Sequence, residues 1–375
     1  MHVDLSLWLR ETGWRFAPHT AAPPPQLVLY FSDPGALDQG GLDELQSRYP
    51  AAVLVGCSTG GEIHAGEVVD NGISAAAISF DRASFAHATV NMAECASSHD
   101  AGLRLADGLP KAGLRAVFVL SDGTHVNGSD LVRALKQALP ADTMLTGGLA
   151  GDRADFKATR VGIGPQPKEG NIVALGLYGD SLSLRHGSFS GWDPFGPERM
   201  VTRSDHNILY ELDGEPALDL YKRYLGDQAR NLPGAALLFP LKIRSLDDSR
   251  TDLVRTVVGI DEANKAMIFA GDIPTGAPAQ MMRGVFTHLI DAAGEAARQA
   301  MGDGSGSLAI LISCIGRKLL LGQRVAEEVD SVAAVLGPKC QTIGFYSYGE
   351  ISPHQFTGSC ELHNQTMTIT VIGED

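Results

Sequence analysis

The sequence has no long apolar stretch, few cysteines and fewer basic than acidic residues. No segment reaches the roughly 18 apolar residues that a membrane-spanning helix needs, and the longest nearly apolar run, Leu308–Ile315, has the length of one strand. The N-terminal segment carries Asp4, Arg10, Glu11 and Arg15 and shows no small-residue cleavage pattern, so no signal peptide is predicted. We therefore expect a cytoplasmic protein without a membrane span.

The scarcity of cysteine argues against a disulfide framework and against a structural zinc cluster. The chain has 5 cysteines, an odd number, and no pair has CxxC spacing, which is typical of thiols kept reduced inside the cell. Cys95 with His99 and Cys360 with His363 are isolated close pairs. Two such pairs so far apart are a weak signal for a four-ligand metal site.

The charge balance makes nucleic acid an unsuitable partner. The chain has 30 Lys and Arg against 44 Asp and Glu, a formal net charge of −14, and an acidic surface repels phosphate backbones. The 44% hydrophobic content excludes a disordered chain. With 375 residues, and about 150 residues per domain, two or three domains are expected.

Strand-like apolar runs alternate with turns and helix-like segments, and no internal repeat of about 20 to 50 residues is evident. Hairpins and helices mix without strict alternation, which favours an α+β or mixed α/β fold over a Rossmann sheet. We expect two lobes with mostly antiparallel or mixed sheets flanked by helices. The predicted division is an N-terminal extension at 1–25, a first domain at 26–210 and a second domain at 211–375.

Some local predictions are specific. Helices are predicted over Gly41–Tyr49 and over Gln280–Met301. A third helix is predicted over Ser129–Leu139, with Ser129 as its N-cap because a serine hydroxyl can accept a hydrogen bond from the first turn. The apolar run Ala235–Leu241 is predicted as a strand.

The segment VLVGCSTGGEI places a loop of small residues directly after an apolar strand. Such a loop exposes backbone N–H groups that can surround an anionic or carbonyl group, which makes its residues candidate ligand contacts: Cys57, Ser58, Thr59 and Gly60. The alternative is a tight turn that needs its glycines, with the cysteine buried as a small hydrophobe. A cysteine nucleophile with His64 as its base is a weaker possibility.

Two further segments have charged residues just after strands. In LTGGLAGDRADF, Asp152 lies with Arg153 and Asp155, and these charges either pair with one another or lie at the rim of a cavity. In SCIGRKLLLGQ, Arg317 and Lys318 follow a buried strand. A guanidinium there is suited to gripping a carboxylate at two points, and the alternative is a solvated positive pair.

The segment TIGFYSYGEISP is predicted as one strand over Thr342–Ile351, in which Tyr346, Tyr348 and Glu350 share a face. Two phenols and a carboxylate on one face are unusual for a core strand, because each polar tip needs a partner if it is buried. These three residues are therefore candidate ligand contacts.

The segment CELHNQTMTITV is predicted as a last strand over Cys360–Ile372. Its Glu361, His363 and Gln365 share one face, which becomes apolar further along. An imidazole beside a carboxylate can be a metal ligand held in one tautomer. A hydrogen-bonded core histidine is the alternative.

Together these segments resemble the FIST family of bacterial sensory proteins, with its FIST N and FIST C domains, from about Gln26 to Ile372. The resemblance implies intracellular signal transduction by binding of a small ligand, with amino acids proposed as ligands. Some FIST proteins of this length are haem-binding nitric oxide sensors that regulate a histidine kinase of a two-component system or a cyclic-di-GMP enzyme. No kinase, GGDEF or PAS segment accompanies the sensor here, so its output would be another chain.

The resemblance leaves the ligand open. For haem, His363 is the candidate axial ligand, with His288 and His354 as alternatives, and Arg317 or Arg283 would meet the propionates. The second hypothesis is a haem-free sensor of an amino acid or small polar metabolite, bound between the lobes.

The candidate contacts of either ligand are Cys57, Ser58, Thr59, Gly60, Asp152, Arg317, Tyr346, Tyr348, Glu350 and Glu361. A third hypothesis is an enzyme with Cys57 or Cys314 as nucleophile. It is the weakest because no Cys-His motif and no orienting group accompany either cysteine. We therefore expect a sensor that is not an enzyme. A histidine kinase, diguanylate cyclase or phosphodiesterase is its expected partner.

Overall fold

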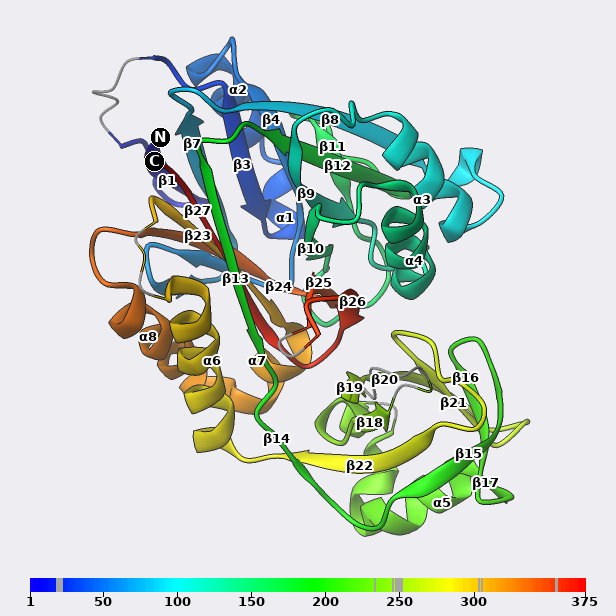
Figure 1. The fold of residues 1–375 in the computed structure, drawn as a ribbon. Coiled ribbons are helices and arrows are strands. Elements are labelled where there is room, and N and C mark those ends of the chain that lie inside the picture. Colours follow the sequence, from blue (N-terminus) through cyan, green and yellow to red (C-terminus); the bar gives the residue numbers. More distant parts are fainter. Residues whose placement is uncertain are drawn as a thin grey trace.

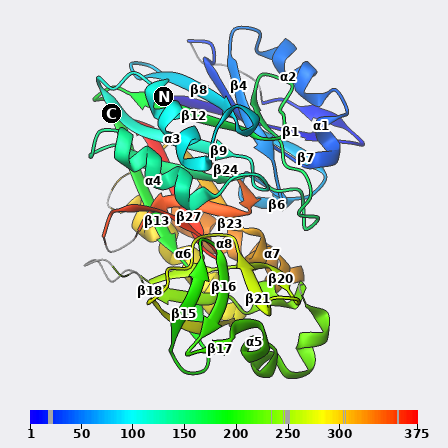
Figure 2. The ribbon, with the colours of Figure 1, turned by 90° about the vertical axis from the view of Figure 1, so that its right-hand side faces the viewer.

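The computed structural model describes residues 1–17, 23–232, 234–244, 246, 252–302, 304, 306–354 and 357–375. As expected, the fold is of the α+β class, with mixed and antiparallel sheets flanked by helices (Figure 1). A large body contains three six-stranded sheets, and a small lobe, residues 192–284, contains a nine-stranded sheet. The small lobe lies below the large body in both ribbon views (Figures 1 and 2). None of the described helices is long and apolar enough to cross a membrane.

The first sheet of the body has the strand order β11-β4-β3-β7-β1-β2. Its strands are β1 (His2–Leu9), β2 (Gly13–Arg15), β3 (Leu27–Ser32), β4 (Val53–Ser58), β7 (Gly72–Ser79) and β11 (Val161–Ile163). The predicted N-terminal extension thus supplies β1 and β2. Helices α1 (Pro34–Leu37) and α2 (Gly41–Arg48) connect the parallel strands β3 and β4, and α2 confirms the helix predicted there.

The second sheet has the order β26-β25-β10-β9-β12-β8. Its strands are β8 (Ser84–Asn91), β9 (Leu114–Ser121), β10 (Met144–Leu149), β12 (Asn171–Tyr178), β25 (Gly349–Pro353) and β26 (Cys360–His363). A 3₁₀ turn, η1 (Met92–Glu94), and helix α3 (Ser98–Asp107) follow β8, and α4 (Gly128–Ala138) connects the parallel strands β9 and β10.

The third sheet has the order β13-β27-β23-β24-β5-β6. Its strands are β5 (Glu62–His64), β6 (Glu67–Val69), β13 (Leu182–Phe189), β23 (Leu308–Cys314), β24 (Gln341–Ser347) and β27 (Met367–Glu374). Strands β23 and β24 are parallel. The helical segments of this part are α6 (Phe286–Met301), α7 (Ile315–Leu321), η4 (Gly322–Arg324) and α8 (Val325–Leu336).

The three sheets of the body have the same arrangement of strands, although the sequence contains no evident short repeat. Each has a parallel pair near its middle, flanked on one side by antiparallel strands and on the other by a strand from elsewhere in the chain. The strand or hairpin after β4 joins the third sheet, the one after β10 joins the first, and the one after β24 joins the second. This cyclic exchange interlocks the three sheets.

The exchange closes on a ring of three backbone hydrogen bonds at the centre of the body. The three bonds are Gly60 N–H to Tyr346 O (2.7 Å), Gly151 N–H to Ser58 O (3.0 Å) and Tyr348 N–H to Leu149 O (3.1 Å). Each of the three segments accepts one bond and donates another from the residue two positions later. A Cβ atom at Gly151 would lie 2.8 Å from the backbone nitrogen of Gly60. This close approach explains why glycine is needed there.

The inner faces of the three sheets bury one apolar core, to which β3, β9, β12, β23 and β24 all contribute. Phe31 and Phe345, from different sheets, lie with ring centroids 4.6 Å apart. All residues of β23 are buried, as expected for a parallel strand covered on both faces. The helices pack on the outside of the sheets (Figure 1). The chain ends also meet, with the Met1 amino group 3.2 Å from the Glu374 carboxylate.

The small lobe has its own apolar core around α5 (Ala217–Leu225). Its strands are β14 (Trp192–Pro194), β15 (Arg199–Asp205), β16 (Ile208–Leu212), β17 (Glu215–Pro216), β18 (Leu241–Arg244), β19 (Asp252–Arg255), β20 (Val257–Asp261), β21 (Ala266–Phe269) and β22 (Pro278–Gly284). Strands β14 and β22 pair antiparallel where the lobe leaves and rejoins the body. We call this pair the strap.

The strands predicted over Thr342–Ile351 and over Cys360–Ile372 are each divided between two sheets, as β24 and β25 and as β26 and β27. Three further local predictions were wrong. The run Ala235–Leu241 is not a strand: a 3₁₀ helix, Gly234–Leu238, precedes β18, and the Tyr221 hydroxyl donates to the carbonyl of Ala236 within it and to that of Phe239 just after it. The helix predicted from Gln280 begins at Phe286, because the preceding residues form β22 and alternate between buried and partly exposed.

The third error concerns the cap of α4. Ser129 is not its N-cap: the Asn127 side chain accepts hydrogen bonds from the backbone of Ser129 and Asp130. Asparagine and serine are both good caps, and the cap lies two residues before the predicted one.

Candidate functional site

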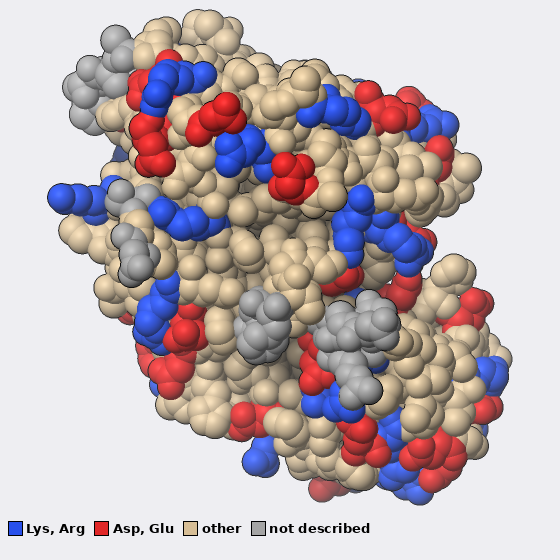
Figure 3. Space-filling view, in the orientation of Figure 1, with Lys and Arg blue, Asp and Glu red and all other residues tan. Residues whose placement is uncertain are grey.

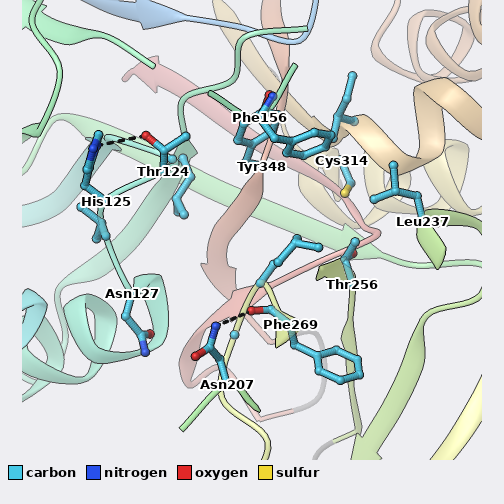
Figure 4. A pocket seen from close by; sticks show the side chains of 17 residues that line it. Thr124, His125, Asn127, Phe156, Asn207, Leu237, Thr256, Phe269, Cys314 and Tyr348 are labelled. Carbon is cyan, nitrogen blue, oxygen red and sulfur yellow. Dashed lines mark hydrogen bonds between the residues drawn. The ribbon is translucent and has the colours of Figure 1, made fainter. Parts of the chain in front are cut away.

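A cavity of about 390 Å³ lies between the large body and the small lobe. This volume is within the range of about 300–1,000 Å³ typical of small-molecule sites. We call it the interlobe pocket. Its lining residues are Gly123, Thr124, His125, Val126, Asn127, Leu149, Phe156, Asn207, Leu237, Thr256, Val258, Phe269, Ala270, Gly271, Cys314, Ile315 and Tyr348 (Figure 4).

One wall is the loop between β9 and α4, which is shaped by a buried carboxylate. Oδ1 of Asp122 accepts hydrogen bonds from the backbone N–H groups of Thr124 (2.8 Å) and His125 (2.7 Å) and from the Thr124 hydroxyl (3.0 Å). Its Oδ2 accepts from Gly170 N–H (2.9 Å). Burial alone would raise the pKa of Asp122, but these donors outweigh it and lower the pKa. The loop is therefore held rigidly.

The start of α4 is fastened to the small lobe. Nδ2 of Asn127 donates to Oδ1 of Asp272 at 3.0 Å, and the Ser129 hydroxyl accepts from the Asp272 backbone N–H at 3.3 Å. A guanidinium nitrogen of Arg133 lies 3.6 Å from the same carboxylate. We call this group the Asp272 latch, since it joins the two lobes beside the pocket.

A second wall is aromatic. The rings of Phe156 and Tyr348 are stacked with centroids 4.5 Å apart (Figure 4). The Tyr348 hydroxyl donates to the Asp152 carboxylate and accepts from the N–H groups of Asp152 and Phe156, both at 3.2 Å. Burial, and then Asp152, raise the pKa of Tyr348. Because its hydroxyl is engaged in this way, Tyr348 presents its ring to the pocket.

The Asp152 carboxylate also orders the loop that carries the aromatic wall. It accepts backbone N–H bonds from Phe156, Lys157 and Ala158, each at 2.8 Å. Phe156 has a positive φ of 53°, which is an uncommon backbone conformation for a side chain of this size. The surrounding hydrogen bonds hold Phe156 in place against Tyr348.

The small lobe supplies the opposite wall. Nδ2 of Asn207 donates to the Phe269 carbonyl at 2.8 Å, as Figure 4 shows. Thr256 lies two strands away, where its backbone N–H contacts Oδ1 of Asn364 at 3.4 Å. The Thr256 hydroxyl oxygen is buried and has no hydrogen-bond partner among the described residues.

The start of α7 completes the lining with Cys314 and Ile315. Burial raises the pKa of the Cys314 thiol, and the nearby Glu350 raises it further. Burial also raises the pKa of Cys57 well above its usual value. Both cysteines are therefore thiols at neutral pH, whereas a nucleophilic cysteine needs the thiolate. This chemistry does not favour a cysteine-dependent enzyme.

The structure brings several of the residues predicted from the sequence to the body's centre, but only one of the ten candidate contacts lines the interlobe pocket. That residue is Tyr348, and Asp152 holds it. The loop from Cys57 to Gly60 lies at the backbone ring and is buried throughout. A Cβ at Gly60 would lie 2.7 Å from Ile315, so protein atoms fill the space in front of this loop.

The polar groups of that first loop bond within the protein. The Ser58 hydroxyl accepts from Arg160 N–H at 2.9 Å. The Thr59 hydroxyl contacts Glu62 at 2.5 Å. Burial is the main cause that raises the pKa of Glu62 to about 8.

Arg317 is fully buried, and its donors are engaged by protein groups. Its guanidinium contacts the Glu328 carboxylate at 2.6 Å, and it donates to the carbonyls of Ser190 and Leu289. The Tyr346 hydroxyl donates to the same glutamate at 3.4 Å. The ligand carboxylate predicted for Arg317 is thus replaced by Glu328, a carboxylate of the protein.

Glu350 and Glu361 also lie outside the pocket lining. Glu350 is buried and accepts from the hydroxyls of Ser347 (2.7 Å) and Thr366 (2.8 Å). Its burial is the main cause that raises the pKa of Glu350 to about 7. Glu361 is partly exposed and pairs with Lys136 at 2.9 Å.

The candidate haem ligands lie elsewhere. His363 is buried, and its Nε2 lies 3.0 Å from the Ser352 carbonyl. Burial is the main cause that lowers the pKa of His363 to about 3. His354 stacks on it with ring centroids 6.0 Å apart, and the cavity beside both rings has about 40 Å³. His288 is largely exposed and pairs with Asp193 at 3.0 Å.

These surroundings do not fit haem. A cavity of about 40 Å³ is far below the size of a cofactor site, and the His288 side chain is 54% exposed, which is unlike an axial ligand enclosed in an apolar pocket. Arg283 lies over the Phe195 ring at 5.9 Å, in the small lobe. Within the described ranges, no group of three or more His, Cys, Asp or Glu side chains could hold a metal ion.

Sequence reasoning did not find His125, Asn127, Asn207, Thr256 or Phe269, although all line the pocket. The first two belong to SDGTHVN, a Ser-Asp-Gly turn after a buried strand, and this signal was present in the sequence. The other three come from ordinary strand ends of the small lobe. Only the docking of the two lobes makes them pocket residues.

Comparison with known proteins bears on the whole chain. The FIST N domain matches residues 26–215, and the FIST C domain matches residues 217–353. The chain belongs to the FIST family. FIST domains are sensory domains that bind small ligands. The border between the two FIST matches falls within the small lobe, so the interlobe pocket contains residues from both.

Other comparisons add little about this FIST protein. No curated protein matches the chain. Among solved structures it is similar to a cyanuric acid hydrolase from A. caulinodans, with 12% identity over 78% of this chain and 68% of that chain and a TM-score of 0.23. A similarity at this level supports no argument about fold or function.

Proposed function

We propose that this FIST protein senses a small polar metabolite in the interlobe pocket and reports its presence through the position of the small lobe. One observation carries the proposal: the pocket walls come from two lobes, and the chain passes between these lobes only through the two strands of the strap. A ligand that contacts both walls favours one lobe position, because it can only shift an equilibrium toward the state that it binds better.

The strap has the features of a hinge. Gly191, just before β14, has a φ of 71°, and a Cβ there would lie 2.5 Å from the His288 carbonyl. The strap packs in a small separate core with Trp192, Met282, Leu289 and Leu321. Hinges are a few residues at element ends that absorb backbone changes, and this junction has that form.

Helix α7 connects the pocket to the strap. Its first residue, Ile315, lines the pocket, while Arg317 bonds to Ser190 before the strap and to Leu289 after it. A displacement of α7 by a ligand would therefore move both ends of the hinge together. This contact chain supports transmission from ligand to lobe position.

The partner in this proposal is another chain, either a histidine kinase or an enzyme that makes or degrades cyclic-di-GMP. The family's sensory role supports a signalling partner. On the face shown in Figure 3, basic and acidic side chains of the described residues are intermixed rather than gathered into a basic patch. This mixture is more suitable for a protein partner than for nucleic acid.

The proposal is tested with a thermal-shift screen of amino acids and other small metabolites. A compound that binds the folded state raises the melting temperature with the logarithm of its concentration. Val258 is 42% exposed and lines the pocket mouth, so Val258→Trp should block binding without disturbing buried packing, and Val258→Ala should preserve it. A metabolite that shifts wild type and Val258→Trp equally would place its site elsewhere and refute the proposal.

The haem hypothesis is separated by an absorption spectrum. We expect protein purified from a haem-replete host to show no Soret band and to take up no haem on titration, because no histidine predicted as ligand has a haem-sized cavity beside it. A Soret band that is lost in His363→Ala but retained in His288→Ala would instead establish a haem site at His363.

A further inference from the structure

We infer that the ligand of the interlobe pocket is uncharged and combines a flat ring with amide-like hydrogen-bonding groups. This inference rests on the proposed function and names the chemical class that the same pocket accepts. It follows from the lining residues, from the polar atoms that the protein leaves free, and from the aromatic wall.

The composition of the pocket lining bears on the charge of the ligand. No Asp, Glu, Lys or Arg lines the pocket among the described residues. The Asp122 carboxylate behind the wall already accepts four hydrogen bonds. The buried guanidinium of Arg255, which lies behind Gly271, donates to the carbonyls of Leu362 and Asp272. A carboxylate or ammonium group in this pocket would lose water without gaining an ionic partner, which is costly.

His125 is the one basic side chain among the described lining residues. Its Nδ1 lies 3.2 Å from the Asp122 carboxylate and 3.0 Å from the Thr124 hydroxyl. Any positive charge on His125 is therefore balanced inside the protein. It does not offer a net cation to a ligand carboxylate.

Most polar side-chain atoms of the pocket lining are already engaged in hydrogen bonds within the protein. The polar atoms of Asn127 bond to the α4 backbone and to Asp272, and the Tyr348 hydroxyl bonds to the Asp152 loop. The Asn207 amide nitrogen is engaged with Phe269. Nε2 of His125 makes no hydrogen bond within the described part of the chain, and neither do two side-chain oxygens: the acceptor Oδ1 of Asn207 and the Thr256 hydroxyl, which is buried.

These two oxygens define what the ligand has to present. An acceptor at Asn207 requires a donor, such as an amide N–H, and a hydroxyl at Thr256 can donate to a carbonyl or accept from an N–H. The two residues lie at the ends of β16 and β20, with β21 between them. Two strand spacings put the backbones that carry these two side chains about 10 Å apart. A ligand that contacts both oxygens therefore needs polar groups at opposite edges of its ring.

The third argument is the shape of the wall between them. The stacked rings of Phe156 and Tyr348 form a flat apolar surface, and Phe156 is 37% exposed. Figure 4 shows these rings across the cavity from Asn207 and Phe269. An aromatic or unsaturated ring gains stacking as well as apolar burial on such a surface.

The test compares matched pairs that differ in one group: benzamide with benzoate, nicotinamide with nicotinate, and indole-3-acetamide with indole-3-acetate. Binding of each at millimolar concentration is measured by saturation-transfer NMR and by thermal shift. We expect the amides to bind and the acids to bind at least about tenfold more weakly, the factor that corresponds to one lost polar interaction. Acids that bind as well as their amides, or no binding by any amide, would overturn the inference.

A charge added at the mouth of the interlobe pocket tests the charge preference directly. Val258→Arg places a cation at the exposed edge of the pocket and should make the acids bind in preference to the amides. Val258→Gln has similar length without charge and should keep the wild-type preference. If both variants prefer the amides, the charge argument fails.

Thr256 is tested separately with Thr256→Val and Thr256→Ser. The valine variant has nearly the same shape but no hydroxyl, and should weaken amide binding about tenfold, whereas the serine variant should retain it. Equal amide affinity in both would remove Thr256 from the site.

The outcomes also separate this inference from the proposed function. A charged metabolite whose binding is blocked by Val258→Trp would leave the sensor proposal intact and refute the inferred class. An absence of any pocket-dependent binder among metabolites and probes would refute both.

Discussion

Two strand ends of the large body have the same Ser-Asp pattern but differ in what binds the aspartate. We call each segment that follows a central strand a junction. Strand β3 ends at Ser32 and is followed by Asp33, and strand β9 ends at Ser121 and is followed by Asp122. In both, the serine hydroxyl donates to the carbonyl of the following aspartate at 3.0 Å, and the aspartate side chain is buried. Arg153 then covers Asp33 with contacts of 2.6 and 2.8 Å.

No guanidinium covers Asp122 among the described residues, and its loop faces the interlobe pocket. A third junction, after β23, is closed by the buried pair of Arg317 and Glu328. The repeated sheet plan therefore gives three similar strand ends, and an arginine pairs with a carboxylate near two of them. The loop after β9 is instead held by backbone donors and faces the pocket, to which the end of β23 contributes Cys314.

The largest effect is expected at the third junction. Arg317→Met leaves Glu328 as an unpaired buried charge, so the free energy of unfolding should fall by about 3–5 kcal/mol. The double variant with Glu328→Met removes the charge as well and should recover part of the loss. Urea denaturation of the three proteins measures both values, and a double variant no more stable than the single one would show that the pair is not the cause.

The matched variants Asp122→Ala and Asp33→Ala compare the open and closed junctions directly. Asp122 bonds four donors in a buried turn, whereas Asp33 bonds one backbone N–H and a half-exposed guanidinium. We expect Asp122→Ala to cost about 3 kcal/mol and Asp33→Ala about 1 kcal/mol. Equal losses in urea denaturation would mean that the two turns are equivalent despite their different partners.

The closed first junction should also show a pH dependence through Glu62. Its pKa is raised to about 8 by burial, against 4.5 when unfolded, so the folded chain holds a proton there that the unfolded chain releases. Stability from this group is full below pH 4.5 and declines as pH rises toward 8.

Glu62→Gln mimics the protonated carboxyl and should remove this decline. The wild-type free energy of unfolding, measured relative to the variant, should therefore fall between pH 4.5 and about pH 8, the limits that the two pKa values set. The change should reach a few kcal/mol, since one pKa unit corresponds to about 1.4 kcal/mol. A constant difference between the two proteins across this range would contradict the assignment.

The smallest effect is expected at the Asp272 latch beside the open junction. Asp272 and Arg133 are 3.6 Å apart and partly exposed, so a double-mutant cycle of Asp272→Asn and Arg133→Met should give a coupling of about 0.5 kcal/mol. A coupling above about 2 kcal/mol would instead indicate a pair far better shielded from water.

Local patterns predicted the α+β class, strand β23, helix α2 and the family. They could not predict which sheet a strand would join. The face shared by Tyr346, Tyr348 and Glu350 assumed one continuous strand, but β24 ends at Ser347 and β25 begins at Gly349 in another sheet. The three side chains therefore lie in different surroundings. Arg317 was placed correctly after a buried strand, but its partner Glu328 lies on another helix.

A ligand site was predicted between a lobe at 26–210 and a lobe at 211–375, whereas the interlobe pocket lies between the body and the inserted lobe at 192–284. Tyr348 was a candidate because two phenols and a carboxylate on one strand face are unusual. Thr256 and Asn207 could not be found, because ordinary strand residues gain a role only when two lobes dock. Such contacts depend on long-range packing that no local pattern contains.

The pairing of Trp192 with Gly284 puts the exit and return of the small lobe opposite each other on neighbouring strands. The lobe is thus a domain insertion whose two ends match a hairpin-sized gap. The three interlocked sheets of the body contain no strand from the small lobe, so this insertion can be replaced without changing their strand order. Residues of the small lobe that line the pocket can therefore vary while the body keeps its fold.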